Sequence, residues 1–217
     1  MPYYPIFLDI KEKRCVVIGG GIVALRKVNM LLDHEAQVEV ISPQLCPELS
    51  ELAANGMVKA VLREYEPGDL QGAFVVVAAT DDSQINEQVA REAMQQGILI
   101  NVADIPELSN FIVPSYLRRG DVTVAVSTGG KSPALARKIR LELERGFGEE
   151  YALLATLIDE VRSELKQQKI TILGDVWQQA LDLDILLELL RSGQRGEAKK
   201  RLWDTLRKDE FQSSNDK

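Results

Sequence analysis

The sequence predicts an α/β protein: a domain with a mainly parallel sheet, followed by a short strand–helix segment and a C-terminal helical module. In the first half of the chain, apolar runs of strand length alternate with stretches whose apolar residues recur at helical spacing. This alternation is typical of a doubly wound parallel sheet. From residue 149 onward, the apolar residues keep helical spacing alone, which predicts helices.

Strands of the first domain are expected at residues 14–18, 38–41, 73–79 and 98–102, with a weaker pattern at residues 58–62. The runs at 14–18 and 73–79 are apolar as in strands that are buried on both faces. Helices are expected at residues 22–32 and 44–54. A third helix should follow the polar segment 80–83, whose side chains can cap it, and should stop at Gly97.

The pattern changes after Asp104. Residues 111–113 and 122–127 are expected strands, and Ser132-Pro133 predicts a helix start, with Ser as N-cap and Pro at the first helical position. The sequence therefore predicts three parts, at residues 1–113, 114–148 and 149–217. The last nine residues are polar, and we expect them to be disordered.

Composition and charge argue against several classes of function. The formal net charge is -7, whereas a nucleic-acid binder normally needs a basic face, so no nucleic-acid partner is expected. No apolar stretch approaches the roughly 18 residues of a membrane span. The N-terminus lacks the features of a signal peptide, which favours a cytoplasmic location. The sequence contains no cysteine–histidine cluster, so no metal site is expected.

The segment Gly19-Gly20-Gly21-Ile22-Val23-Ala24 is a GxGxxA motif between an expected strand and an expected helix. In this context Gly19 allows a tight turn, Gly21 lets the backbone approach a pyrophosphate, and Ala24 lets the helix pack close to the sheet. The helix N-terminus offers N–H donors to the phosphates. The motif in this place predicts a Rossmann domain that binds a dinucleotide.

The usual ribose ligand of such domains is missing. An Asp or Glu normally follows the second strand, but this strand ends at Ile41-Ser42-Pro43, and Ser42 is the available hydrogen-bonding group. Glu39 lies within the strand and is expected to be exposed. No Arg stands at this strand end to attract a 2′-phosphate, which favours NAD over NADP.

Asp104 follows the expected strand 98–102, at the edge where open α/β sheets bind ligands. A carboxylate there could accept a proton or orient a substrate. The alternative is a helix-cap or turn aspartate, and position alone does not separate the two.

The segment 127–137 combines hydroxyls, glycines and a helix start with basic residues, which predicts an anion-binding edge. The alternative for each basic residue is a solvated helix face. The candidate substrate-binding residues are Ser127, Thr128, Gly129, Lys131 and Arg137.

Several ordered blocks resemble the precorrin-2 dehydrogenase / sirohydrochlorin ferrochelatase family. They cover roughly residues 5–145 and include the following segments: Pro5–Asp9, Gly19–Ala24 with Arg26-Lys27, Ala78–Asp82, Asn101–Asp104, Phe111–Ser115 and Ser127–Arg137. The helical C-terminal third is compatible with the family but carries little signature.

The resemblance implies that precorrin-2 is oxidised to sirohydrochlorin, with hydride passing to NAD and Asp104 as the catalytic residue. Ile22 and Val23 match the cofactor loop, and Thr80 lies in a matched block beside it. Ser42, Pro43 and Gln44 match the adenosine end. Thr128 matches a serine that can be phosphorylated in some relatives. The resemblance also implies a homodimer in which residues 114–148 exchange between subunits.

Alternatives remain open from the sequence. A bifunctional enzyme would also insert Fe²⁺ into sirohydrochlorin, with the metal as substrate. A non-catalytic NAD-sensing module would not need Asp104, and an oxidoreductase acting on a small acid would usually need a catalytic His, Lys or Tyr in its cleft. Some family members continue into a uroporphyrinogen methyltransferase domain; this sequence ends at Lys217 and is expected to lack that activity.

Overall fold

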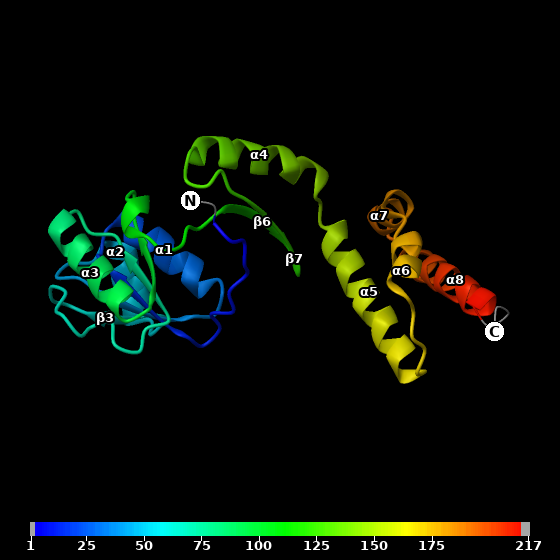
Figure 1. The fold of residues 1–217 in the computed structure, drawn as a ribbon, viewed down its shortest axis with the longest axis horizontal. Helices are drawn as coiled ribbons and strands as arrows, with labels where there is room; N and C mark the ends of the chain where they lie inside the picture. The colour runs from blue at the N-terminus through cyan, green and yellow to red at the C-terminus, as the bar shows by residue number, and fades with distance from the viewer. Residues whose placement is uncertain (1–2, 214–217) are drawn as a thin grey trace. The chain divides into compact units, whose positions relative to one another are not determined.

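The computed structural model describes the backbone of residues 3–213 and the side chains of residues 3–207. It divides the chain into an N-terminal unit, Met1–Val113, and a C-terminal unit, Pro114–Lys217, which are described separately (Figure 1). The further boundary at residue 148 stays a prediction. No helix within the described residues is long and apolar enough to cross a membrane.

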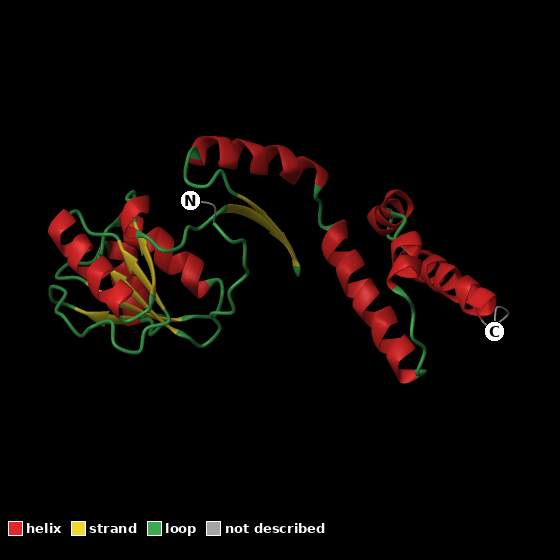
Figure 2. Cartoon of the chain, viewed as in Figure 1, coloured by secondary structure: helices red, strands yellow, loops and turns green. Residues whose placement is uncertain are grey.

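The N-terminal unit is a parallel five-stranded sheet with helices on both faces (Figure 2). The strand order is β3-β2-β1-β4-β5. The strands are β1 (Arg14–Ile18), β2 (Gln37–Ile41), β3 (Lys59–Val61), β4 (Val75–Ala78) and β5 (Leu99–Val102). The helices are α1 (Ile22–Leu32), α2 (Pro47–Ala54) and α3 (Ser83–Gln95), and a 3-10 turn, η1, spans Pro106–Leu108. The predicted Rossmann-type α/β fold is confirmed.

Alternate residues of the central strands enter two separate cores, which explains why these strands are apolar throughout. Val16 and Val76 face α3, whereas Val17 and Val77 face α1 and α2. The chain returns from each helix to the same end of the sheet, so every parallel strand ends at one edge. The loops at that edge are therefore anchored by the ends of several buried strands.

The segment after β5 differs from the expected strand at residues 111–113. Asn110 lies against β5 and bonds it through backbone and side chain: its N–H donates to Ile100 O, and its Oδ1 accepts from Ile100 N at 2.8 Å. Its Nδ2 donates to Ile98 O at 2.9 Å. A side-chain amide therefore takes the place of strand pairing, and the next strand begins only at Ser115.

The C-terminal unit contains an antiparallel pair, β6 (Ser115–Arg119) and β7 (Val122–Val126), with α4 (Pro133–Gly146) packed on it. The helices α5 (Glu150–Gln167), α6 (Gly174–Ala180), α7 (Leu183–Arg191) and α8 (Arg195–Ser213) follow. Leucines of α5, α7 and α8 form their cores. The expected disordered tail falls partly on α8, and residues 214–217 lie outside the described residues.

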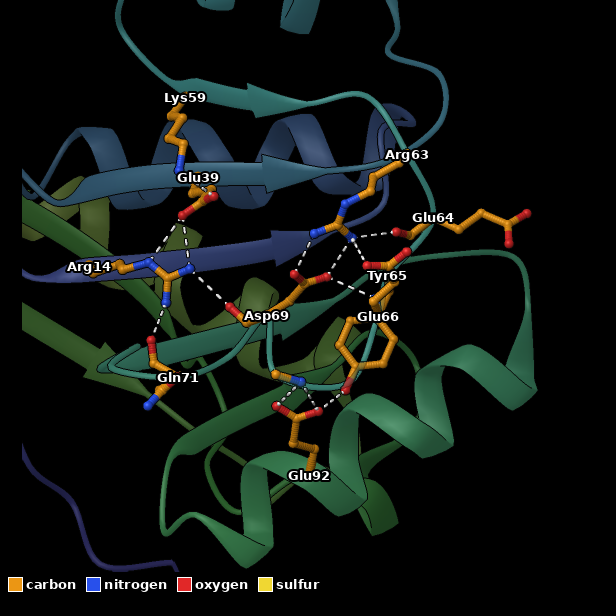
Figure 3. Close-up of polar contacts among 11 residues, drawn as sticks. Arg14, Glu39, Lys59, Arg63, Glu64, Tyr65, Glu66, Asp69, Gln71 and Glu92 are labelled. Carbon is orange, nitrogen blue, oxygen red and sulfur yellow. Dashed lines mark hydrogen bonds and ion pairs between the residues drawn. The ribbon is translucent and has the colours of Figure 1, made fainter.

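A polar network crosses the sheet beside β1 (Figure 3). Glu39 is only 8% exposed, which corrects the expectation of an exposed side chain. Arg14 and Lys59 each approach its carboxylate to 2.9 Å. Burial alone would raise the pKa of Glu39, but the hydrogen bonds and charges of Lys59 and Arg14 outweigh it, so this pKa lies below its usual value. The paired charges make burial possible.

The loop 63–71 is held by a second pair in the same network. Both guanidinium ends of Arg63 bind the Asp69 carboxylate, at 2.6 and 2.8 Å, and Asp69 also accepts from Glu66 N. Tyr65 donates its hydroxyl proton to Glu92 of α3, which ties the loop to the helix (Figure 3). The hydrogen bond from Arg63 lowers the pKa of Asp69.

We expect Asp69→Asn to lower the free energy of unfolding by about 1–3 kcal/mol near neutral pH, because it removes a bidentate charged pair. Since the pKa of Asp69 is lower in the folded state, the pair stabilises the fold above the unfolded-state pKa, and this is lost as pH falls through the folded-state pKa. Urea unfolding at several pH values should show the difference from wild type shrinking in acid. Glu66→Gln is the matched control, because the Glu66 carboxylate is exposed and lies 3.8 Å from Arg63. It should lower the free energy of unfolding by less than about 0.5 kcal/mol. Equal losses for both variants would contradict the assignment.

Candidate dinucleotide-binding cleft

A cleft of about 650 Å³ lies at the carboxyl ends of β1, β2 and β4. It is lined by three loops: the glycine loop after β1, the 42–46 loop after β2 and the 79–82 loop after β4. The predicted cofactor residues Gly19, Gly21, Ile22, Val23, Ser42, Pro43, Gln44 and Thr80 all line it. The structure thus brings these residues together around one space.

The glycine loop is shaped by two close approaches of backbone to backbone. Gly19 has φ 118°, and a Cβ there would lie 2.4 Å from Ala79 O. A Cβ at Gly20 would lie 1.9 Å from Gln44 O. Gly20 occupies a variable position of the motif, so the sequence did not single it out. Both glycines are required by the fold itself, because the loops after β2 and β4 press against the turn.

Gly21 differs, because a Cβ there would meet no atom within 4 Å. It is the N-cap of α1, and no side chain among the described residues caps this helix. The first-turn N–H groups therefore face the cleft with no intrahelical partner. Ala24, in the next turn, is fully buried against the sheet. The open space at Gly21 and the uncapped helix start fit a pyrophosphate.

The loop after β2 holds its own polar groups. Ser42 is 8% exposed, and its hydroxyl donates to Gln44 O at 2.7 Å, so its proton is already committed. Glu64, just after β3, also lines this part of the cleft, and its carboxylate forms no ion pair with the described residues. Figure 3 shows this side chain turned away from the Arg63–Asp69 pair. The Rossmann motif places an acid after β2, whereas here an acid reaches the cleft after the neighbouring strand, β3, where no sequence motif predicts it.

Thr80 shapes the β4–α3 turn. Its hydroxyl donates to Asn86 Oδ1 at 2.9 Å, and it also accepts from Asp82 N. Asn86 is buried and returns a bond to Thr80 O. Asp82, as the N-cap, accepts from two N–H groups of α3. The side chains of this turn are thus fixed by one another at the wall of the cleft.

Asp104 stands at the same edge of the sheet, in the turn after β5. It is exposed and has φ 61°, a left-handed conformation that is uncommon for residues other than glycine. Ser109 holds this turn by accepting from Val102 N and donating to Ile105 O. Ser109 thus fixes the backbone of the turn, and the Asp104 side chain is exposed at the edge where open α/β sheets bind ligands.

Lys27 of α1 reaches toward Asp104. Its Nζ donates to the buried Asn101 Oδ1 at 3.1 Å. Burial lowers the pKa of Lys27, and the negative charge of Asp104 opposes that shift. In the sequence, Lys27 stands out only as part of a matched block. It lies three residues after Ala24 and four before Leu31, both buried, and this spacing could have placed it on the face of α1 toward the sheet. The half-buried amine thus lies within electrostatic range of the Asp104 carboxylate.

The predicted substrate-binding residues lie in the C-terminal unit, on the loop that leads from β7 to α4. Thr128 Oγ1 donates to Ser132 O and accepts from Ser132 N, both at 3.0 Å, and Ser127 Oγ accepts from Gly129 N. These hydroxyls close the loop on itself. Lys131 and Arg137 are exposed and form no ion pair with the described residues, whereas Lys138 and Arg140 pair with glutamates of α4.

A parallel sheet, a glycine turn and an uncapped helix start define a dinucleotide-binding domain of the Rossmann type. The family described as "Putative NAD(P)-binding" matches residues 6–115, about half of the chain. The chain therefore belongs to this NAD(P)-binding family. The family described as "Sirohaem biosynthesis protein central" matches residues 119–146.

Similar proteins include the siroheme synthase of Nitrosococcus oceani, 42% identical over 200 residues that cover 91% of this chain and 42% of the relative. Siroheme synthase 3 of Aeromonas hydrophila is 39% identical and covers 100% of this chain and 46% of the relative. The chain thus spans less than half the length of these relatives. The solved structure titled "SirC, precorrin-2 dehydrogenase" shares the fold, with a TM-score of 0.70 and 24% identity over 95% of this chain and 100% of that one. The resemblance found in the sequence is confirmed.

We expect Gly21→Ala to fold normally but to weaken binding of the dinucleotide about tenfold or more, because its methyl group would occupy the space left for the pyrophosphate. Its backbone conformation suits alanine, so the free energy of unfolding should change by less than about 1 kcal/mol. Gly20→Ala is the matched control: its Cβ would strike Gln44 O, and it should lose about 1–3 kcal/mol or more. NADH fluorescence titration and thermal unfolding measure the two effects. Unaltered affinity in Gly21→Ala would place the phosphates elsewhere.

Proposed function

We propose that this protein oxidises precorrin-2 to sirohydrochlorin, with NAD as hydride acceptor. One observation carries the proposal: the cradle at Gly21 and the Asp104 carboxylate lie at the same carboxyl edge of one sheet. The similarity to siroheme synthases supports the choice of substrate, and the resemblance of residues 5–145 supports the role of Asp104.

The oxidation removes a hydride and a proton from adjacent atoms of the ring system. Bound NAD supplies the electron sink that takes the hydride. The chain's own part is to bind the pyrophosphate at α1, to hold the macrocycle against the cofactor, and to accept the proton at Asp104. Lys27, which donates to Asn101 next to the strand end that carries Asp104, adds a positive charge to this part of the proposed site.

The structure offers cations for the carboxylates of the substrate. Lys131 and Arg137, on the loop and first turns around α4, are exposed and without ion-pair partners among the described residues. Guanidinium and ammonium groups bind carboxylates through charged hydrogen bonds. We assign these two side chains, with the loop Ser127–Gly129, to substrate binding. A phosphate on Thr128 would remove the hydroxyl hydrogen, and with it the bond that Thr128 donates to Ser132 O.

We also propose a homodimer formed through residues 114–148. Two antiparallel strands alone make a marginal sheet, and α4 leaves Leu135 and Ile139 52% and 38% exposed. Light scattering should give twice the chain mass of 24.2 kDa. Leu135→Glu with Ile139→Glu should shift the protein to monomers, whereas Met94→Glu, an exposed methionine of α3, should not. A monomeric wild type would contradict the dimer.

NAD rather than NADP is the proposed cofactor, because Glu64 lies at the adenosine end of the cleft, where its charge would repel a 2′-phosphate. We expect Glu64→Gln to reduce the ratio of NAD to NADP affinity about five- to tenfold. Titration of both reduced cofactors measures this ratio. Glu66→Gln, whose side chain does not line the cleft, should leave it unchanged. A ratio unaffected by Glu64→Gln would remove Glu64 from the cofactor site.

We expect Asp104→Asn to lower kcat about 100- to 10,000-fold in anaerobic assays with precorrin-2 and NAD, because the amide cannot accept the proton. NAD affinity should stay unchanged. Glu107→Gln, in the adjoining turn, is the control and should keep normal turnover. Full activity in Asp104→Asn would refute its role, and the absence of any NAD-dependent change in wild type would refute the reaction and favour an NAD-sensing module. Addition of Fe²⁺ to the product tests the bifunctional alternative.

A further inference from the structure

A second groove lies within the helical part of the C-terminal unit. Its volume is about 420 Å³, and it lies between the last turns of α5 and the start of α6. Its lining combines three cations, Arg162, Lys166 and Lys169, with the indole of Trp177 and the side chains of Ile170 and Ile172. Nothing in the proposed reaction uses these residues.

Two cations at the start of α8 are already paired with acids of α5. Arg195 pairs with Glu160, and Lys199 pairs with Glu164, so the neighbouring face of α5 is neutralised by its own acids. Arg162, Lys166 and Lys169 have no ion-pair partner among the residues with described side chains. In a chain of net charge -7, a cluster of unpaired cations indicates a site for an anion.

The partial charge at the C-terminus of α5 explains part of this cluster. Cations in a last helical turn are stabilised there, which accounts for Lys166 and Lys169. It does not account for Arg162, which lies further from the helix end and places its guanidinium 5.9 Å from the centre of the Trp177 ring. The helix end therefore does not account for Arg162, whose guanidinium lies over the Trp177 indole instead.

Trp177 carries the second observation. Its side chain is half-buried, and the indole N–H donates to no group among the described residues. The other tryptophan, Trp203, donates its indole N–H to Glu164 at 3.2 Å. Ile170 and Ile172 pack beside Trp177 on the core formed by α5 and α8. The groove thus offers an apolar floor, an indole with a free donor, and three cations.

We propose that this groove binds the edge of a planar polycarboxylate, of the tetrapyrrole class that the proposed reaction uses, and so holds substrate or product apart from the cleft. This assignment rests on the proposed function for its ligand class. Cations at the rim would take the carboxylates, whereas the indole and isoleucines would contact the flat ring. An isolated phosphate would use the cations but would gain nothing from the apolar floor.

The test uses the full chain carrying Trp203→Phe, which leaves Trp177 as the sole tryptophan, and uroporphyrin as the stable polycarboxylate probe. We expect saturable quenching of Trp177 fluorescence without NAD. Arg162→Ala, Lys166→Ala and Lys169→Ala together should weaken uroporphyrin about tenfold or more. Lys13→Ala, Arg91→Ala and Lys200→Ala remove the same charge from exposed sites elsewhere and should change affinity less than about twofold. If circular dichroism shows that the triple variant is unfolded, each single glutamine variant should still weaken binding.

Equal losses in the groove and control variants, or no loss in either, would overturn the groove assignment. Displacement of uroporphyrin by inorganic pyrophosphate at similar concentration would overturn it too, since the site would then recognise phosphate. Asp104→Asn should leave the titration unchanged. If the protein oxidises precorrin-2 but the groove variants bind uroporphyrin as tightly as wild type, only the groove assignment is wrong. If the groove variants lose uroporphyrin binding but the wild type does not oxidise precorrin-2, only the proposed reaction is wrong.

Discussion

The close approach of three loops at Gly19 and Gly20 is the constraint on which the rest of the N-terminal unit depends. The carbonyls of Ala79 and Gln44 occupy the space that side chains at these two positions would need. The turn after β1 can therefore pack closely between the loops after β2 and β4. As a result, α1 begins at the sheet edge with its N-terminus toward the cleft. The position of α1 in turn sets where Lys27 reaches Asn101 and Asp104. The cofactor cradle at Gly21 and the candidate base Asp104 are therefore positioned by the same packing of loops.

Much of this arrangement could be predicted from the sequence because its cause is local. Continuous apolar runs predicted the buried strands, and the spacing of Gly19, Gly21 and Ala24 predicted the cradle. The order of strands then brings together loops whose positions in the chain are far apart. Ser42, Gln44 and Thr80 could be assigned to one cleft because parallel strands end at one edge.

Other features depend on partners that are distant in the chain, and no local pattern predicts them. Glu39 is buried because Arg14 and Lys59 meet it from neighbouring strands. Gly20 is required because Gln44 O lies above it. Glu64 enters the cleft from the loop after β3, the strand next to the one after which the motif places an acid. The strand expected at residues 111–113 is absent because Asn110 already bonds β5 through its amide. In each case a specific contact across the fold decides the outcome.

The amide of Asn110 has a consequence for the behaviour of the unit as a folded body. β5 is the last strand of the sheet, and an open last strand presents unpaired N–H and C=O groups on which another chain can add. Asn110 satisfies Ile100 and Ile98, and Ser109 satisfies Val102, so these groups are not available for further pairing. The same fold-back that fixes the Asp104 turn thus protects the β5 edge of the sheet against pairing with another chain.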